Sequence, residues 1–104
     1  KQSESGPSGG LMMALALYNS LVEEDITKGK KIIGTGTIDI QGNVGGIGGI
    51  RYKLIGAVKK DADVFLVPEE NYEEAVNVKN EKGYDIRLIS VSTLSEAIDA
   101  LRKL

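Results

Sequence analysis

The residues best suited to chemistry lie near the start of the chain, where Ser8 sits in the glycine-rich turn Gly6-Pro7-Ser8-Gly9-Gly10. The apolar segment 11–22 follows directly, and proline suits the first position of a helix, so the turn is predicted to open a helix. The first backbone N–H groups of a helix lack internal partners and lie at the positive end of its dipole. A hydroxyl held there could be a nucleophile beside an oxyanion site, a phosphate contact or a helix cap. The local sequence by itself favours the cap, with Ser5 or Ser8 as the capping residue.

The composition restricts what chemistry is available. The 104 residues include no cysteine and no histidine, which excludes thiolate catalysis, a Ser-His-Asp triad and the usual zinc sites. Acid–base chemistry must then come from Lys, Asp, Glu, Tyr or a terminus. With neither cysteine nor histidine, we expect no metal site. The net charge is −2 and the basic residues are scattered, so we expect no nucleic-acid partner and no polybasic membrane patch.

A lysine could serve as the base for Ser8. Such a lysine must lose its proton near neutral pH, and burial among apolar groups is the usual way to lower a lysine pKa. Lys53 lies at the flank of the apolar face of a helix predicted to begin near Ile50, but Lys59 and Lys60 are close by in sequence. Helical periodicity does not single out Lys53, and a lysine at such an edge is most often a surface residue whose stem covers apolar neighbours.

The glycine-rich stretch 42–49 is a rival site. It follows a predicted strand and precedes a predicted helix, which is the setting of a phosphate-binding loop. It lacks the regular Gly-x-Gly-x-x-Gly spacing and the Gly-Lys-Ser/Thr ending of such loops. It therefore indicates a nucleotide site only weakly.

Strands and helices that could position these residues alternate along the chain. In order they are a helix at 11–22, a strand at 32–40, a turn at 41–43, a helix from Ile50, a buried strand at 64–67, a helix from 69 or 70 to about 78, a strand at 85–89, and a closing helix with a capping box at Thr93–Glu96. This order favours one α/β domain whose sheet is at least partly parallel. The first helix is apolar all round, which predicts that missing chain or a partner subunit covers it.

Four motifs follow one another along nearly the whole chain. They are Gly6-Pro7-Ser8-Gly9-Gly10, then Gly34-Thr35-Gly36-Thr37-Ile38-Asp39 with Gly42-Asn43-Val44, then Gly48-Gly49-Ile50-Arg51-Tyr52-Lys53, then Val67-Pro68-Glu69-Glu70-Asn71. Together they resemble the nucleophile turn, the Thr-Gly strand, the Gly-Gly-x-x-x-Lys helix start and the Pro-x-x-Asn turn of the proteolytic domain of the Lon family of serine peptidases. The resemblance implies that Ser8 is the nucleophile and Lys53 the general base.

The same resemblance extends to neighbouring residues. It implies that Thr35 supports the lysine through a side-chain hydrogen bond, and that Gly6, Pro7 and Gly9 form the oxyanion and substrate turn. Gly9 departs from the family pattern, which usually has alanine there. Ser5 also departs from it, since the family commonly has an acidic residue at that position.

The resemblance also implies a fold and a setting. We expect a mixed α/β, two-layer sheet-and-helix domain of the Lon proteolytic type. Residues 1–104 would form its C-terminal portion, without the strands that precede the serine in that family. The implied partners are protein or peptide substrates, with no cofactor and no ATP site in this chain, and a homo-oligomeric ring in the intact protein.

Within the family, the residue choices look closest to bacterial Lon-like peptidases that carry a PDZ domain. Such parents are anchored through an N-terminal segment and face outward from the cytoplasmic membrane. A cytoplasmic location is the alternative.

Two rivals from other function classes stay open. One is a fragment of a GHMP-type small-molecule kinase, in which the first turn holds nucleotide phosphate and Lys53 has no special role. The other is a Lon-like domain that has lost catalysis and serves as an assembly platform. The distance between Ser8 Oγ and Lys53 Nζ is the most informative measurement, because hydrogen-bond reach supports a Ser/Lys dyad.

Overall fold

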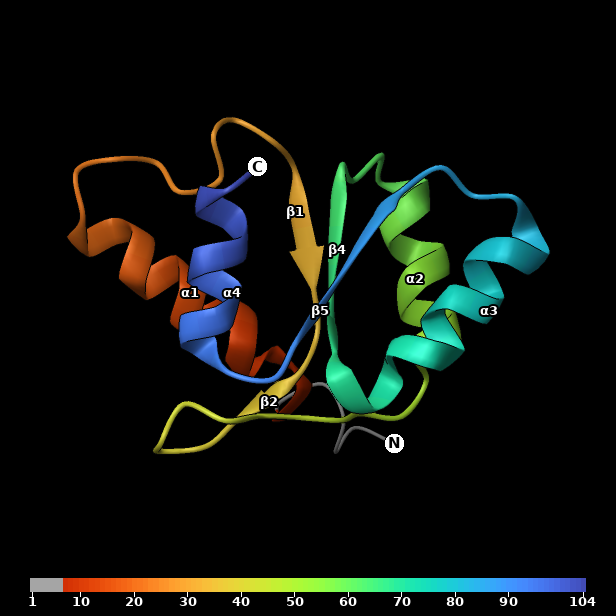
Figure 1. The fold of residues 1–104 in the computed structure, drawn as a ribbon, viewed down its shortest axis with the longest axis horizontal. Coiled ribbons are helices and arrows are strands. Elements are labelled where there is room, and N and C mark those ends of the chain that lie inside the picture. Colours follow the sequence, from red (N-terminus) through yellow and green to blue (C-terminus); the bar gives the residue numbers. More distant parts are fainter. Residues whose placement is uncertain (1–6) are drawn as a thin grey trace.

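A parallel three-stranded sheet forms the centre of the computed structural model, which describes residues 7–104 (Figure 1). The strands are β1 (Ile32–Gly34), β4 (Val64–Pro68) and β5 (Arg87–Val91), in the order β1-β4-β5. Ile33 pairs with Phe65, and Phe65 pairs with Leu88 on its other side. The predicted α/β class with a parallel sheet is confirmed.

The central strand β4 shows why helices cover both faces of this sheet. All five of its residues are buried, and alternate side chains enter two different cores. Val64 and Leu66 belong to one core, whereas Phe65 and Val67 belong to the other. The helices that cover the two faces are α1 (Gly10–Leu21) with α4 (Leu94–Arg102), and α2 (Ile50–Lys59) with α3 (Tyr72–Lys82) (Figure 1). A parallel sheet flanked in this way makes three layers, where two were expected.

The predicted strand at 32–40 is divided between two sheets. β1 ends at Gly34, and β2 (Thr37–Ile38) pairs with β3 (Val44–Gly45) in a separate antiparallel sheet. Between them the chain turns toward the start of α1: the Gly36 N–H donates to the Ser8 carbonyl at 2.9 Å. The Gly36 carbonyl in turn accepts from the Leu11 N–H at 3.0 Å. The prediction of one strand was wrong because local β propensity does not depend on these contacts with a distant turn.

The other predicted elements agree more closely with the structure. A single 3-10 turn, η3 (Glu69–Asn71), precedes α3, and Gly83 ends α3 in the left-handed conformation with φ 69°. At the start of α4, the Thr93 side chain accepts from the Glu96 N–H at 3.0 Å, as the capping box predicts. The last strand begins at Arg87, two residues later than predicted.

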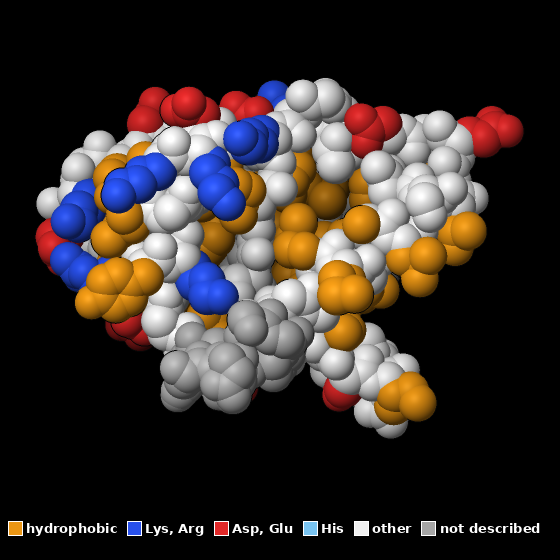
Figure 2. Space-filling view, turned by 180° about the vertical axis from the view of Figure 1, so that it is seen from behind, with side chains coloured by type: hydrophobic (Ala, Val, Ile, Leu, Met, Phe, Trp, Pro, Cys, Tyr) orange, Lys and Arg blue, Asp and Glu red, His pale blue; other side chains and the backbone are white. Residues whose placement is uncertain are grey.

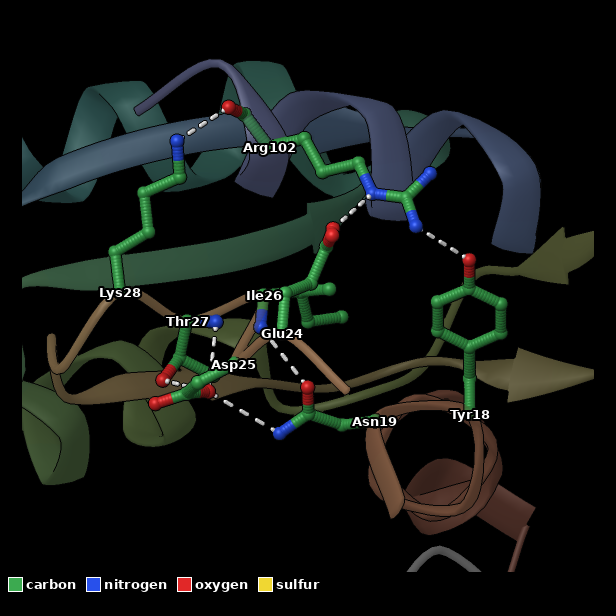
Figure 3. A network of polar contacts seen from close by, with 8 residues as sticks. All are labelled: Tyr18, Asn19, Glu24, Asp25, Ile26, Thr27, Lys28 and Arg102. Atoms are coloured by element: carbon green, nitrogen blue, oxygen red, sulfur yellow. Dashed lines mark hydrogen bonds and ion pairs between the residues drawn. The ribbon is translucent and has the colours of Figure 1, made fainter. Parts of the chain in front are cut away.

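A polar network joins the C-terminal half of α1 to the following loop and to α4 (Figure 3). Arg102 donates to Glu24 at 2.9 Å and to the Tyr18 hydroxyl at 2.7 Å. Asn19 accepts from the Ile26 N–H at 2.9 Å, and Ile26 is buried in the core beneath. These contacts hold α1 at its far end, while the turn that precedes α1 carries Ser8.

The first helix is covered on one side only within residues 7–104. Leu11 and Leu15 are buried, whereas Met13, Leu17 and Leu21 are 73%, 64% and 76% exposed. These three residues recur every four positions and therefore form one apolar stripe. No helix within the described range has the length and apolar character needed to cross a membrane.

Candidate active site

Ser8 is held in place by the end of strand β1. It lies in the 3-10 turn η2 (Pro7–Gly9), immediately before α1, and is only 4% exposed. Its carbonyl accepts from the Gly36 N–H at 2.9 Å and from the Thr35 hydroxyl at 3.4 Å. The N-cap of α1 is Gly9, so the prediction that Ser8 occupies the capping position was wrong.

Two of the predicted turn residues, Pro7 and Gly9, lie in η2 with Ser8. Gly6, the third, lies outside the described residues, as does the alternative cap Ser5.

Lys53 reaches Ser8 from the other face of the sheet. It lies in the first turn of α2, which begins after Gly49, a residue in the left-handed conformation with φ 73°. The half-buried Lys53 side chain donates from Nζ to Ser8 Oγ at 3.2 Å. Lys59 and Lys60 are exposed at the far end of the same helix. The tertiary structure therefore selects one lysine where helical periodicity left three.

Thr35 contacts the serine turn and not the lysine. It is 2% exposed and follows β1, and its backbone N–H donates to the Leu66 carbonyl at 3.2 Å. Its hydroxyl donates to the Ser8 carbonyl, and within residues 7–104 it makes no hydrogen bond to Lys53. The Thr35 hydroxyl thus contacts the serine turn in place of the expected lysine, because the pairing with Leu66 fixes the backbone of Thr35 beside η2.

The glycines on either side of Thr35 allow the close packing around the site. A Cβ at Gly34 would lie 2.8 Å from the Leu66 Cβ. One at Gly36 would lie 2.9 Å from Val44 Cγ1, and the φ of Gly36 is 148°. A larger residue at Gly34 would push β1 away from β4, and one at Gly36 would push the chain away from β3.

Two N–H groups of the glycine-rich stretch 42–49 donate to side chains that follow β4. The Gly46 N–H donates to Glu70 Oε1 at 2.9 Å, and the Ile47 N–H donates to Asn71 Oδ1 at 3.0 Å. Asn71 Nδ2 also donates to the Ile47 carbonyl at 2.9 Å. A carboxylate at this loop disfavours phosphate, because like charges repel. Sequence reasoning gave Glu70 and Asn71 no place at the site, and their only signal was membership of the fourth motif.

A hollow of about 280 Å³ lies beside Lys53, between β1 and α2. Ile33, Ala57 and Phe65 give it apolar walls, Lys53 and Lys60 also line it, and no acidic residue does. Figure 2 shows hydrophobic side chains within a hollow on this side of the molecule, with basic side chains beside it. Such a surface can accept an apolar side chain of a bound peptide. Within the described range, no group of His, Cys, Asp and Glu residues is arranged to hold a metal ion.

Comparison with known families agrees with the four motifs. The model of the Lon protease (S16) C-terminal proteolytic domain matches residues 2–103. The chain belongs to this Lon family. The matched range covers all four motifs, including those that carry Ser8, Thr35, Lys53 and Asn71.

Individual relatives give the same family. The Lon protease of Campylobacter concisus is 36% identical over 97 residues, which cover 91% of this chain and 12% of that protein. The Lon protease of Desulfatibacillum aliphaticivorans is 32% identical over 96 residues, covering 92% of this chain and 11% of that protein. That of Aster yellows witches'-broom phytoplasma is 31% identical over 93 residues. The chain thus spans about one-ninth of the length of these Lon relatives, and the closeness to PDZ-carrying members stays a prediction.

Proposed function

We propose that this chain is the C-terminal portion of a serine endopeptidase domain that hydrolyses protein or peptide substrates through Ser8 and Lys53. The observation that carries the proposal is the 3.2 Å hydrogen bond between Lys53 Nζ and Ser8 Oγ. Membership of a proteolytic-domain family supports it. The absence of histidine from the sequence leaves a lysine as the natural base for a serine nucleophile.

The proposed reaction follows from this contact. Neutral Lys53 takes the proton of Ser8 Oγ as the oxygen attacks the peptide carbonyl carbon. The lysine then protonates the leaving amine, and an acyl group remains on the serine. Water, activated by the same lysine, releases the acyl group and restores the hydroxyl. No cofactor takes part in these steps.

Backbone N–H groups at the start of α1 would stabilise the tetrahedral oxyanion. Helix-terminal N–H groups lack partners within the helix and lie at the positive end of its dipole. The N–H of Ser8 is the candidate donor, held in η2 by the contacts of the Ser8 carbonyl with Thr35 and Gly36. Loss of one such donor typically lowers the rate by about 10²–10³-fold. Thr35 would therefore act by positioning the nucleophile turn.

The dyad is tested by Ser8→Ala and Lys53→Ala in the full-length protein. Each substitution is expected to abolish hydrolysis of an unfolded protein such as casein, because one removes the nucleophile and the other the base. Circular dichroism should show that both variants stay folded. Lys59→Ala is the matched control, since Lys59 is exposed on the same helix, and it should hydrolyse casein at the wild-type rate. Wild-type activity in either dyad variant would contradict the mechanism.

The same set of proteins separates the rival functions. A catalytically silent assembly domain predicts no casein hydrolysis by the wild type. A kinase-like domain predicts a nucleotide-dependent rise in melting temperature that changes in the first glycine turn would remove. Membership of a proteolytic-domain family favours the peptidase over the kinase-like domain.

A further inference from the structure

The side chain of Asn71 holds the loop that leads into the helix of Lys53. We propose that Asn71 is a positioning residue of the dyad, which fixes the start of α2 and so sets the place of Lys53 Nζ relative to Ser8 Oγ. The inference rests on the proposed function, and it assigns to the reaction a residue that does not touch the reacting atoms.

Two hydrogen bonds from the Asn71 side chain form a clamp on a single residue, Ile47. Asn71 Oδ1 accepts from the Ile47 N–H at 3.0 Å, and Asn71 Nδ2 donates to the Ile47 carbonyl at 2.9 Å. Both groups are partly buried, so without Asn71 they would lose their partners in a place that water reaches poorly. Glu70 adds a third contact at 2.9 Å to the adjacent Gly46 N–H. The loop is thereby held by side chains from η3.

The clamped loop leads directly into the first turn of α2. Gly49, two residues after Ile47, is the left-handed residue before α2. The Gly49 carbonyl accepts from the N–H groups of Tyr52 and Lys53, both at 3.1 Å. Only a few residues, among them the left-handed Gly49, therefore separate the clamp from the Lys53 backbone.

Apolar packing does not replace this clamp. Ile50 and Leu54 are buried against the second core, but burial of apolar area is non-directional and sets no hydrogen-bond register. The side chain of lysine is long and flexible, so its amine reaches a defined point only when its backbone is fixed. The hydrogen bonds of Ile47 are directional, and they fix the loop from which the Lys53 backbone continues.

The two partners of the dyad are anchored alike. Ser8 is held by Thr35 and Gly36, which follow β1, and Lys53 is held through Glu70 and Asn71, which follow β4. These strands are parallel neighbours, so their carboxyl ends lie at the same edge of the sheet. In open α/β sheets that edge is where functional residues gather. The sheet thus sets the separation between the two anchors.

The test compares Asn71→Ala and Asn71→Asp with wild type in the full-length protein, at a temperature where each variant is folded. We expect Asn71→Ala to lower kcat roughly 10²-fold, as misplacement of a catalytic group by about 1 Å does, with KM changed less than twofold. Asn71→Asp keeps the acceptor for the Ile47 N–H and loses the donor, so its kcat should be intermediate. The rate at which a fluorophosphonate probe labels Ser8 should fall in the same order, since that rate reports activation of the hydroxyl without a peptide substrate.

Two controls separate positioning from stability. Asn77→Ala changes an exposed asparagine on α3 and should leave kcat and labelling at wild-type values. The second control is the melting temperature of each Asn71 variant, measured beside kcat and labelling. A merely structural role for Asn71 would lower the melting temperature while kcat and labelling of the folded protein stay unchanged, which would overturn the inference.

The outcomes also distinguish this inference from the proposed function. If Ser8→Ala and Lys53→Ala are inactive while folded Asn71→Ala works like wild type, only the positioning role fails. If Ser8→Ala or Lys53→Ala keeps wild-type activity, the dyad itself fails. Should Asn71→Ala not fold, Asn71→Asp carries the test, and wild-type kcat and labelling in that variant would overturn the positioning role.

Discussion

At the scale of single residues, the chemistry of the site depends on which lysine meets Ser8. Lys53, Lys59 and Lys60 belong to one helical segment and differ little in local sequence. Only Lys53 lies in the first turn of α2, where its amine reaches Ser8 Oγ across the end of the sheet. The choice is made by the ends of β1 and β4, which hold the backbones of the two residues.

A glycine beside the serine gives a prediction at this scale. Gly9 has φ −88° and ψ −3°, and apart from its chain neighbours a Cβ there would meet no atom of residues 7–104 within 4 Å. Gly9→Ala should therefore keep activity and raise the free energy of unfolding by about 0.4–1 kcal/mol, because alanine reduces the entropy of the unfolded chain. Urea denaturation of this chain and casein hydrolysis by the full-length protein check both parts.

The neighbouring glycine is the matched control. A Cβ at Gly10 would lie 2.9 Å from Ile38 Cγ2 and 3.2 Å from the Ile38 nitrogen. Gly10→Ala should be destabilising, by about 1–3 kcal/mol, because the packing around β2 must shift. Equal stabilities of the two variants would contradict this account of the turn.

At the scale of elements, the hairpin of β2 and β3 depends on one carboxylate. Asp39 accepts from the N–H groups of Gln41 and Asn43 at 2.9 and 2.8 Å, and from the Asn43 side chain at 3.1 Å. These hydrogen bonds, chiefly the one from the Asn43 backbone, hold the pKa of Asp39 below its ordinary value. The ionised form therefore favours the folded hairpin.

The pH dependence of this stabilisation has a definite sign. Because the pKa of Asp39 is lower in the folded protein, its contribution is fully present above the ordinary aspartate pKa of about 3.9 and is lost as pH falls through the lowered folded value. Asp39→Asn should thus unfold at lower urea than wild type at pH 6, and the gap should narrow toward pH 3. A gap that stays constant over this range would contradict the role of the charge.

At the scale of the whole molecule, the stripe of Met13, Leu17 and Leu21 bears on assembly. Stable exposure of large apolar side chains in one patch typically marks a contact surface. The proposed homo-oligomer of the full-length protein predicts that Leu17→Glu weakens self-association at least tenfold, since it places a charge in that stripe. Sedimentation velocity measures this, with Glu73→Ala, an exposed change on the opposite layer, as control. A monodisperse wild-type monomer at high concentration would contradict the proposal.

The sequence by itself determined the local elements and the family motifs. Buried strand β4, helix α2 and the capped start of α4 follow from apolar runs, periodicity and the preference of Thr93 for a capping position, which are properties of neighbouring residues. The order of the four motifs pointed to Ser8 and Lys53 because such motifs specify residues by their distance along the chain.

Only the tertiary structure decided how these residues meet. It divided the predicted strand 32–40, directed the Thr35 hydroxyl to the Ser8 carbonyl, and set Asn71 against the loop before α2. The contacts of Thr35 and Asn71 join segments more than twenty positions apart, so local propensity cannot predict them. The residues next to Ser8, taken alone, predict a helix cap. The parallel pairing of β1 with β4 sets both anchors at one edge and so places the lysine amine against the hydroxyl.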